Sequence, residues 1–294
     1  MNVMLNCFSR DVCSRVILPL VLLAMSPAVP SLAQVVELTI LHTNDTHSRI
    51  EPFDATDPSY PDMGGAARRN AYFAQVRTEK ENVLLFDCGD FSQGTPFYSV
   101  FKGEVEVELM NEMGYDAATL GNHEFDFGLD NLKELMEEAD FPFVCTNYDF
   151  SRTKLRRLVK PYLIIKKAGL RIGVIGLGAC PDGLVQAKNY EGMKFVPPYG
   201  IAERTARYLK ERKRCDVVIC LSHLGMDCSA NLPYCDRELV GSTSSIDLVL
   251  GGHSHTYMAA PEYVENAEGR AVPVMQLGKN GVYAGRFDLK FEKK

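Results

Sequence analysis

Hydrophobic and polar residues alternate along the chain in blocks that predict an α/β fold. Short apolar runs rich in β-branched side chains predict buried strands, and they cover residues 35–42, 83–87, 141–146, 171–177, 216–222 and 246–250. Amphipathic stretches between several of these runs predict helices over residues 66–80, 105–113, 129–139 and 201–214. Two closing strands are expected over residues 272–277 and 283–291. We therefore predict one α/β domain that covers residues 34–294.

The polar residues that carry chemistry gather where the apolar runs end. Five of the six histidines lie in short polar motifs flanked by strand-like segments, and an acidic motif accompanies them. In an α/β fold the strand ends carry the ligand-binding residues. The motifs are Asp45-Thr46-His47, Asp87-Cys88-Gly89-Asp90, Gly121-Asn122-His123-Glu124, Ser222-His223 and Gly251-Gly252-His253-Ser254-His255. Imidazole and carboxylate groups bind borderline divalent metals, so the set predicts a site for two metal ions.

The spacing inside two of the motifs supports this interpretation. Asp45 and His47 lie two residues apart, as do His253 and His255, so an extended backbone would point each pair to one side of the chain. A lone Asp-x-His is more typical of a solvated turn. Two histidines in a turn after a strand seldom have a purely structural role. The presence of the other motifs strengthens the assignment of both pairs as metal ligands.

Composition and charge narrow the classes of function. The 294 residues are 46% hydrophobic and 24% charged, which fits a globular chain and excludes a disordered or fibrous one. The formal net charge of -6 disfavours nucleic acid as an electrostatic partner. The glycines at residues 173–178 lack the G-x-G-x-x-G spacing, so a dinucleotide-binding loop is not expected.

The first 33 residues are typical of a secretory signal peptide. Arg10 and Arg15 precede an apolar run over residues 16–25, and Ser31-Leu32-Ala33 offers small residues where a signal peptidase reads. The run is shorter than the roughly 20 residues that a membrane span needs. An uncleaved anchor or a buried N-terminal helix is the alternative. We expect cleavage after Ala33, export to the periplasm or the extracellular space, and no membrane span.

Seven of the nine cysteines follow the predicted cleavage point. Cys228 and Cys235 bracket a short polar loop and are the best candidates for a disulfide in an oxidising compartment. Four others lie in apolar runs or at their ends, where we expect them to act as small buried hydrophobic residues. These four are Cys88, Cys145, Cys180 and Cys220.

Taken together, the motifs resemble those of the calcineurin-like metallophosphoesterases. The match includes residues 41–47 (LHTNDTH) and the other four motifs in family order, and it spans almost the whole chain after the predicted signal peptide. Asn44-Asp45 and His123-Glu124-Phe125-Asp126 resemble the 5'-nucleotidase branch in particular. The resemblance implies the family architecture, a four-layer α-β-β-α sandwich in which two stacked sheets are flanked by helices.

The resemblance also implies roles for individual residues. One divalent metal ion would be bound by Asp45, His47, Asp90 and His255, and a second by Asp90, Asn122, His223 and His253. His123 and Asp126 resemble the catalytic dyad of the family. Glu124 is expected to be structural, as the acceptor of a backbone hydrogen bond, and His42 to be a core or supporting histidine. The ligand set accepts zinc, manganese or iron.

The implied reaction is hydrolysis of a small phosphate ester, with a nucleotide as the expected substrate. Two cations on the order of 3.5–4 Å apart can share a hydroxide that attacks phosphorus in line with the leaving oxygen. His123 would then donate a proton to the phosphoryl oxygen or the leaving group. Arg68 and Arg69 either lie on a helix surface or face the phosphate, and the sequence leaves both open. Phe97 and Tyr98 are expected in the core or at a rim.

Enzymes of the 5'-nucleotidase type usually continue into a C-terminal domain that stacks the nucleobase and grips the phosphate. Because this sequence ends at Lys294, we expect that domain to be absent. Three functions stay open. The chain hydrolyses nucleotides with a separately encoded C-terminal nucleotidase domain as partner, or it acts alone as a broad phosphomonoesterase or cyclic-nucleotide phosphodiesterase. The third is a non-catalytic interaction module stabilised by metal, which the complete ligand set disfavours.

Overall fold

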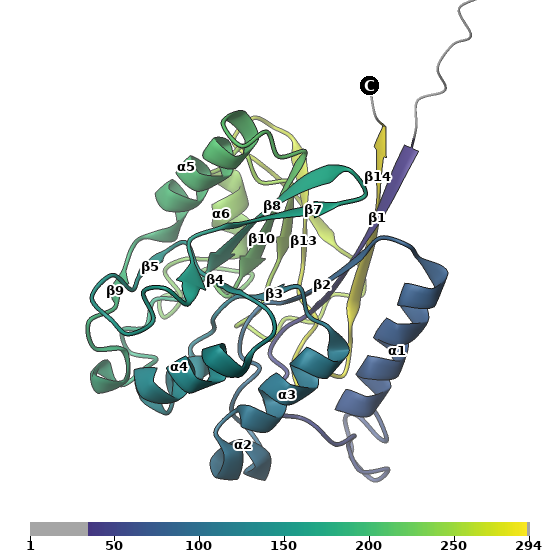
Figure 1. Cartoon of the computed structure of the whole chain (residues 1–294), viewed down its shortest axis with the longest axis vertical. Helices are drawn as coiled ribbons and strands as arrows, with labels where there is room; N and C mark the ends of the chain where they lie inside the picture. The colour runs from purple at the N-terminus through teal and green to yellow at the C-terminus, as the bar shows by residue number, and fades with distance from the viewer. Residues whose placement is uncertain (1–34, 293–294) are drawn as a thin grey trace, which may run out of the picture.

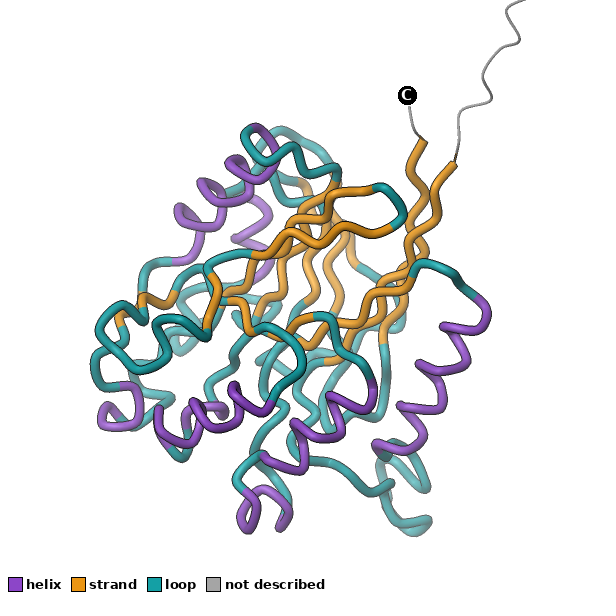
Figure 2. The backbone as a smooth tube through the Cα atoms, viewed as in Figure 1, coloured by secondary structure: helices purple, strands orange, loops and turns teal. Residues whose placement is uncertain are grey.

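Two six-stranded β-sheets form the centre of the molecule, as Figure 1 shows, in a computed structural model that describes residues 35–292. The sheets stack face to face, and helices cover the outer face of each (Figure 2). This arrangement confirms the predicted four-layer α-β-β-α sandwich. The predicted signal peptide, residues 1–33, lies outside the described residues.

The first sheet has the strand order β14-β1-β2-β3-β4-β6. Its neighbouring strands run parallel, except that β14 pairs antiparallel with β1. Its strands are β1 (Val35–Thr43), β2 (Val83–Asp87), β3 (Ala117–Ala118), β4 (Phe143–Val144), β6 (Val159–Lys160) and β14 (Gly285–Glu292). The parallel part therefore aligns the carboxyl ends of β1 and β2 at one edge.

The second sheet has the strand order β12-β13-β11-β10-β8-β7. Its four inner strands are parallel, and β12 and β7 pair antiparallel at the two edges. Its strands are β7 (Leu163–Lys167), β8 (Leu170–Leu177), β10 (Val217–Ser222), β11 (Leu248–Leu250), β12 (Glu262–Glu265) and β13 (Ala271–Met275). A separate two-stranded sheet joins β5 (Tyr148–Asp149) to β9 (Lys194–Phe195).

The helices divide between the two sheets. In Figure 1, α1, α3 and α4 lie along the lower side against the first sheet, while α5 and α6 lie at the upper left against the second. The helices are α1 (Ala66–Glu79), α2 (Pro96–Phe101), α3 (Glu104–Met113), α4 (Gly128–Glu138), α5 (Pro198–Glu211) and α6 (Asp236–Gly241), with short 3-10 turns η1 (His123–Phe125) and η2 (Ala187–Tyr190). Among the described residues, no helix has the length and apolar character that crossing a bilayer requires.

Three apolar clusters hold the layers together. Leu38 and Ile40 of β1 point into the cluster between the sheets, whereas Leu41 points to the cluster under α1, α3 and α4. A third cluster fills the space between the second sheet and α5 and α6. Because the central strands are buried on both faces, their sequences are continuous apolar runs.

The structure confirms the predicted disulfide between Cys228 and Cys235. It also confirms Cys88, Cys145 and Cys220 as buried free cysteines. The expectation for Cys180 was wrong, because this free thiol is only half-buried. Cys180 follows the end of β8 in a surface loop, so it has no covering layer on one side.

Candidate metal centre

The predicted ligands come together at the carboxyl ends of the parallel strands, in two adjacent groups. Within each group, one ligand atom per residue lies within 4.8 Å of every other. The first group consists of Asp45, His47 and His255, and the second consists of Asp90, His223 and His253. Both sheets contribute, because the turns after β1 and β2 face the turns after β10 and β11.

In the first group, three polar atoms converge from both sheets. Asp45 Oδ1 lies 3.4 Å from His255 Nε2 and 3.9 Å from His47 Nε2. The two Nε2 atoms are 3.0 Å apart. Asp45 Oδ1 is also 4.0 Å from His223 Nε2, so the two groups adjoin.

The second group contains buried polar atoms that no protein group satisfies. His223 Nε2 lies 3.0 Å from Asp90 Oδ2, yet without hydrogen-bond geometry. Among the described residues, Asn122 Oδ1 is likewise buried with no hydrogen-bond partner. A buried unpaired carbonyl oxygen is costly unless something binds it. This donor set of imidazole nitrogen, carboxylate and amide oxygen therefore fits a divalent cation.

Hydrogen bonds to the backbone orient two of the imidazoles. His223 Nδ1 is 2.7 Å from the carbonyl oxygen of Cys88, and His47 Nδ1 is 3.3 Å from that of Ser92. A carbonyl oxygen only accepts, so Nδ1 carries the proton in a neutral ring. The Nε2 lone pair then remains available to a metal, which is the usual arrangement at metal-binding histidines.

The backbone is strained at five of the seven predicted ligand residues. Asp45, His47, Asp90, His253 and His255 all have positive φ angles, of 48°, 47°, 55°, 77° and 53°. Residues other than glycine adopt this left-handed region rarely, at a cost of about 1–3 kcal/mol each. An extended chain was expected to align Asp45 with His47, and His253 with His255. Asp45 and His47 do converge in the first group, through left-handed turns, whereas His253 and His255 divide between the two groups.

Asn44 holds the Asp45 carboxylate in position. Its side-chain amide donates to Asp45 Oδ2 over 2.6 Å and to the carbonyl of Gly278 over 2.9 Å, and its Oδ1 accepts from the Leu277 N–H over 3.0 Å. The His253 N–H adds a bond of 3.0 Å to Asp45 Oδ2. Asn44 was not among the predicted site residues. Its place directly before a ligand was the available signal.

Glu124 fixes the loops that carry the second group. Its carboxylate accepts backbone hydrogen bonds from Gly121 (2.6 Å), Asp90 (3.0 Å) and Ser92 (3.2 Å). The expected structural role of Glu124 is confirmed. The sequence predicted a single hydrogen bond, whereas this carboxylate joins two loops through three of them. Gly121 is needed beside it, because a Cβ there would overlap Asp90 Oδ1.

The second group contains one buried carboxylate, Asp90, whose charge a cation or a proton has to compensate. Burial by itself would raise the pKa of Asp90, but the imidazoles of His223, His123 and His47 outweigh burial and hold this pKa below its usual range. Burial acts to lower the pKa of His223, and Asp90 instead raises it to about 10. Without a cation, Asp90 is thus ionised at neutral pH and the His223 ring carries the compensating proton, which a bound metal ion would displace from Nε2.

His123 and Asp126 form a pair beside the two groups. His123 Nδ1 lies 2.9 Å from Asp126 Oδ2, and both side chains are partly exposed. The His123 ring lies edge-on to His47, with 5.6 Å between centroids. Burial lowers the pKa of His123, but its bond to Asp126 and the nearby Asp90 prevail and raise it. Tyr98, expected in the core or at a rim, is buried and donates to the His123 carbonyl over 3.1 Å.

His42 belongs to the core. It is fully buried on β1 and stacks against Phe287, with 6.0 Å between ring centroids. Burial lowers its pKa to about 3, so the ring is neutral. The structure thus agrees with the interpretation of His42 as a core histidine.

The sequence left the positions of Arg68 and Arg69 open, and the structure places these two arginines differently. Arg68 is exposed and pairs with Asp62. Arg69 is half-buried, and its guanidinium donates to the carbonyls of Gly281 (3.1 Å) and Arg49 (3.4 Å). Both side chains are therefore engaged with protein groups, and Arg69 ties two loops together.

The chain is similar to known proteins over most of its length. A family model described as Calcineurin-like phosphoesterase matches residues 38–257. The chain is 30% identical over 290 residues to the Trifunctional nucleotide phosphoesterase protein YfkN of Bacillus subtilis (strain 168), covering 88% of this chain and 18% of that protein. It is 33% identical over 278 residues to the Snake venom 5'-nucleotidase of Gloydius brevicauda, covering 88% of this chain and 46% of that one.

The fold is similar to that of a solved structure as well. The crystal structure of the 5'-nucleotidase precursor from Thermus thermophilus superposes with a TM-score of 0.78 and 33% identity, over 87% of this chain and 52% of that one. The chain thus spans about half of these nucleotidases, and a smaller share of the B. subtilis protein.

Proposed function

The chain belongs to the calcineurin-like phosphoesterase family, and we propose that it is a hydrolase of phosphate esters that uses two divalent cations, with nucleotides as its substrates. The observation that carries the proposal is the pair of adjoining ligand groups built on left-handed backbone. Such strain persists only where the surrounding structure enforces it, and it concentrates at functional sites.

Seven residues would hold the cations. Asp90 would serve both ions, which suits a carboxylate with one oxygen 3.0 Å from His223 Nε2. The first ion would be held by Asp45, His47, Asp90 and His255, and the second by Asp90, Asn122, His223 and His253. The mixture of nitrogen and oxygen donors accepts zinc, manganese or iron.

A cation pair, when bound, polarises the phosphoryl oxygens and supplies a water of lowered pKa as nucleophile. The rest of the mechanism falls to the protein's own groups. His123 carries a proton that it donates to the leaving oxygen as the ester bond breaks, and its raised pKa favours the protonated form. Asp126 orients the ring through Nδ1, which leaves Nε2 for the substrate.

Nucleotides are proposed because the relatives named above carry that substrate in their names. The word "Trifunctional" in the name of the B. subtilis relative also favours a second candidate, a broader nucleotide phosphoesterase. Export to the periplasm or the extracellular space is part of the proposal. The disulfide Cys228–Cys235 supports it, because such bonds persist in oxidising compartments.

The test is hydrolysis of AMP, a cyclic nucleotide and p-nitrophenyl phosphate by the purified protein with zinc, manganese or iron. We expect AMP hydrolysis that a chelator abolishes. Asp90→Asn should abolish hydrolysis with every metal, because it weakens both cation sites. Full activity of Asp90→Asn would overturn the proposal of two cations.

His123→Ala separates catalysis from metal binding. We expect this variant to retain its bound metal, measured by elemental analysis, while turnover falls roughly 100-fold or more, as for loss of a general acid. Tyr263→Ala is the matched control, because this aromatic side chain is 66% exposed on β12. Loss of metal in His123→Ala would show that His123 is a ligand instead.

A further inference from the structure

We propose that a groove beside the second ligand group binds the nucleoside part of the substrate; this inference rests on the proposed function. The groove has a volume of about 500 Å³, within the usual range for small-molecule sites. The loop after β8 forms one wall, and the disulfide-closed hairpin of residues 228–235 forms the other. Its lining includes Asp182, Leu184, Leu224, Asn231, Leu232 and Tyr234.

The position of the groove follows from sheet topology. It lies at the carboxyl ends of the parallel neighbours β8 and β10, where α/β sheets bind their ligands. Leu224 at its base directly follows His223, whose N–H donates to the carbonyl of Leu177 at the end of β8 over 2.7 Å. One residue of the lining is thus the chain neighbour of a residue in the second ligand group.

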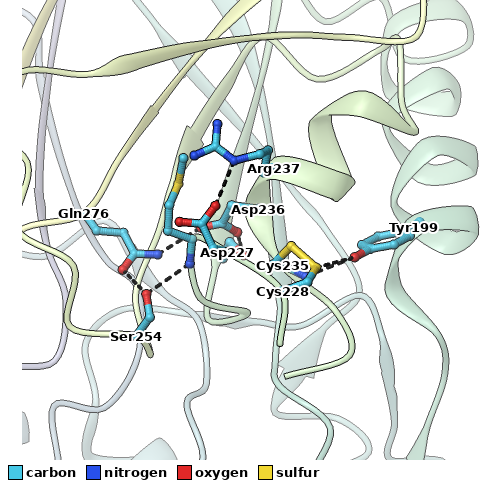
Figure 3. The surroundings of a disulfide bond; sticks show 10 residues. Tyr199, Asp227, Cys228, Cys235, Asp236, Arg237, Ser254 and Gln276 are labelled. Carbon is cyan, nitrogen blue, oxygen red and sulfur yellow. Dashed lines mark hydrogen bonds and ion pairs between the residues drawn. A yellow bond between two sulfur atoms is a disulfide. The ribbon is translucent and has the colours of Figure 1, made fainter. Parts of the chain in front are cut away.

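The hairpin is attached to the loop that carries the double-histidine motif, and Figure 3 shows this attachment. Ser254 of that loop accepts a hydrogen bond from the Met226 N–H (3.0 Å) and donates to Gln276 (2.9 Å). The Gln276 amide donates in turn to Asp236, next to the disulfide, over 3.1 Å. A Cβ built on Gly225 would lie 3.4 Å from Ser254 and 3.5 Å from Leu232, so the hairpin packs close to the metal loop.

An aromatic ring is held rigidly at the hairpin end of the groove. Tyr234 packs against Phe195 and Tyr199, with ring centroids 5.7 Å and 5.4 Å away. The Tyr199 hydroxyl accepts the Cys235 N–H over 3.0 Å, as Figure 3 shows, and this fixes the ring beside the disulfide. An aromatic ring that is already held in place can stack against a base at little cost in side-chain entropy.

The chemistry of the lining suits a nucleoside. Leu184 and Leu232 give an apolar surface for a flat heteroaromatic base, and Leu184 is 43% exposed where such a base would cover it. Asp182 and Asn231 are exposed at the walls and can bond the ribose hydroxyls and the polar edge of the base. A simple phosphate ester without a base would gain none of these contacts.

Cys180 allows a binding test that does not depend on catalysis. It lines the groove and is half-buried, whereas the other free cysteines of residues 35–292 are buried or lie outside the groove. In the metal-loaded protein, adenosine or uridine should slow the alkylation of Cys180 by iodoacetamide. The rate is measured by peptide mass spectrometry. We expect roughly tenfold slowing when the nucleoside exceeds its dissociation constant about tenfold. Equal slowing by ribose alone would mean a sugar site and would overturn the nucleoside assignment.

Kinetics test the same groove through the proposed reaction. Leu184→Ala and Asn231→Ala should each raise KM for AMP roughly tenfold, while kcat/KM for glycerol 2-phosphate stays within about twofold. Val100→Ala is the matched control, an exposed aliphatic residue on α2 that does not line the groove. This variant should leave the kinetic constants for both substrates unchanged.

The outcomes separate the two proposals. If the wild type hydrolyses neither ester with any metal, the proposed function fails, and Cys180 protection still tests the groove by itself. If AMP is hydrolysed while both variants keep the wild-type KM and nucleosides leave alkylation unchanged, the groove proposal is overturned.

Discussion

At the scale of single residues, the turns that carry the candidate metal ligands are held by groups outside the ligand set. Glu124 accepts three backbone N–H groups and Asn44 makes three bonds of its own, and together they fix the turns on which the ligands lie. Left-handed turns of non-glycine residues are unstable alone, so these bonds must supply the compensation. Ligand identity is therefore only part of what the sequence has to encode here.

Glu124→Gln tests this support directly. The substitution replaces one acceptor oxygen by an NH2 group that faces a backbone N–H, so at least one of the three bonds is lost. We expect metal affinity to fall roughly 10–100-fold, as for other groups that orient ligands, measured by metal titration with calorimetry. Glu134→Gln, an exposed glutamate on α4, is the control. Unchanged affinity in Glu124→Gln would show that the turns hold without it.

The buried His42 ring fits on β1 only because residue 285 opposite it is a glycine. A Cβ at Gly285 would overlap Nε2 of the buried His42 ring, and neither can move away because β1 and β14 pair at this point. Gly285→Ala should lower the free energy of unfolding by about 1–3 kcal/mol, the cost of overpacking, measured by urea denaturation.

The double variant His42→Ala/Gly285→Ala provides the check. Removing the ring frees the space for the new methyl group, so the two effects should be strongly non-additive. Gly241→Ala is the matched control, since nothing lies within 4 Å of a Cβ there. Additive losses in the double variant would refute the steric explanation.

At the scale of elements, the apolar pattern predicted the long buried strands well. Residues 35–42, 83–87, 171–177 and 216–222 correspond to β1, β2, β8 and β10 within a residue or so at each end. These strands are covered on both faces, so their continuous apolar runs are unambiguous. Predicted helix 201–214 begins earlier, at Pro198, because a proline is tolerated in the first turn.

Elements with weak patterns were missed. β3 has two residues, and in β7 every side chain but the exposed Lys166 is partly buried, so neither strand gives a clear period. α2 and α6 have six residues each, fewer than two helical turns. The candidate ligands were easier to find in the sequence than these elements, because their residue types are rare together, and the structure brings them into two groups. Their left-handed turns and the support from Asn44 depend on contacts between distant segments, which no local pattern reports.

The disulfide-closed hairpin permits a prediction about an element. Replacing Cys228 and Cys235 together by serine opens a loop with a sequence separation of 7. Loop-closure entropy for so short a loop predicts a loss of about 2–3 kcal/mol in the free energy of unfolding, measured by urea denaturation. Cys180→Ser is the control because its thiol is free. Equal stability of the double variant and the wild type would mean that the hairpin is held by its hydrogen bonds alone.

At the scale of the whole molecule, the two sheets meet at the metal centre. Asp45, His47, Asp90 and Asn122 follow strands of the first sheet, and His223, His253 and His255 follow strands of the second. Elsewhere the sheets are joined by apolar packing and by a few hydrogen bonds, such as that from the Thr146 N–H to the Gly176 carbonyl over 2.7 Å. Bound cations would therefore act as a clamp between the halves of the sandwich, in addition to any catalytic role.

Metal removal tests this clamp. A ligand that binds only the folded state stabilises it by mass action, by about 2.7 kcal/mol per site at 100 times its dissociation constant. We expect the melting temperature to rise with metal concentration and to fall with a chelator. Asp90→Asn should show a much smaller response, since this residue would serve both ions. After chelation, hydrogen exchange should also become faster both in residues 44–48, which follow β1 of the first sheet, and in residues 251–256, which follow β11 of the second. Faster exchange in one sheet alone would mean that the cations do not join the two halves.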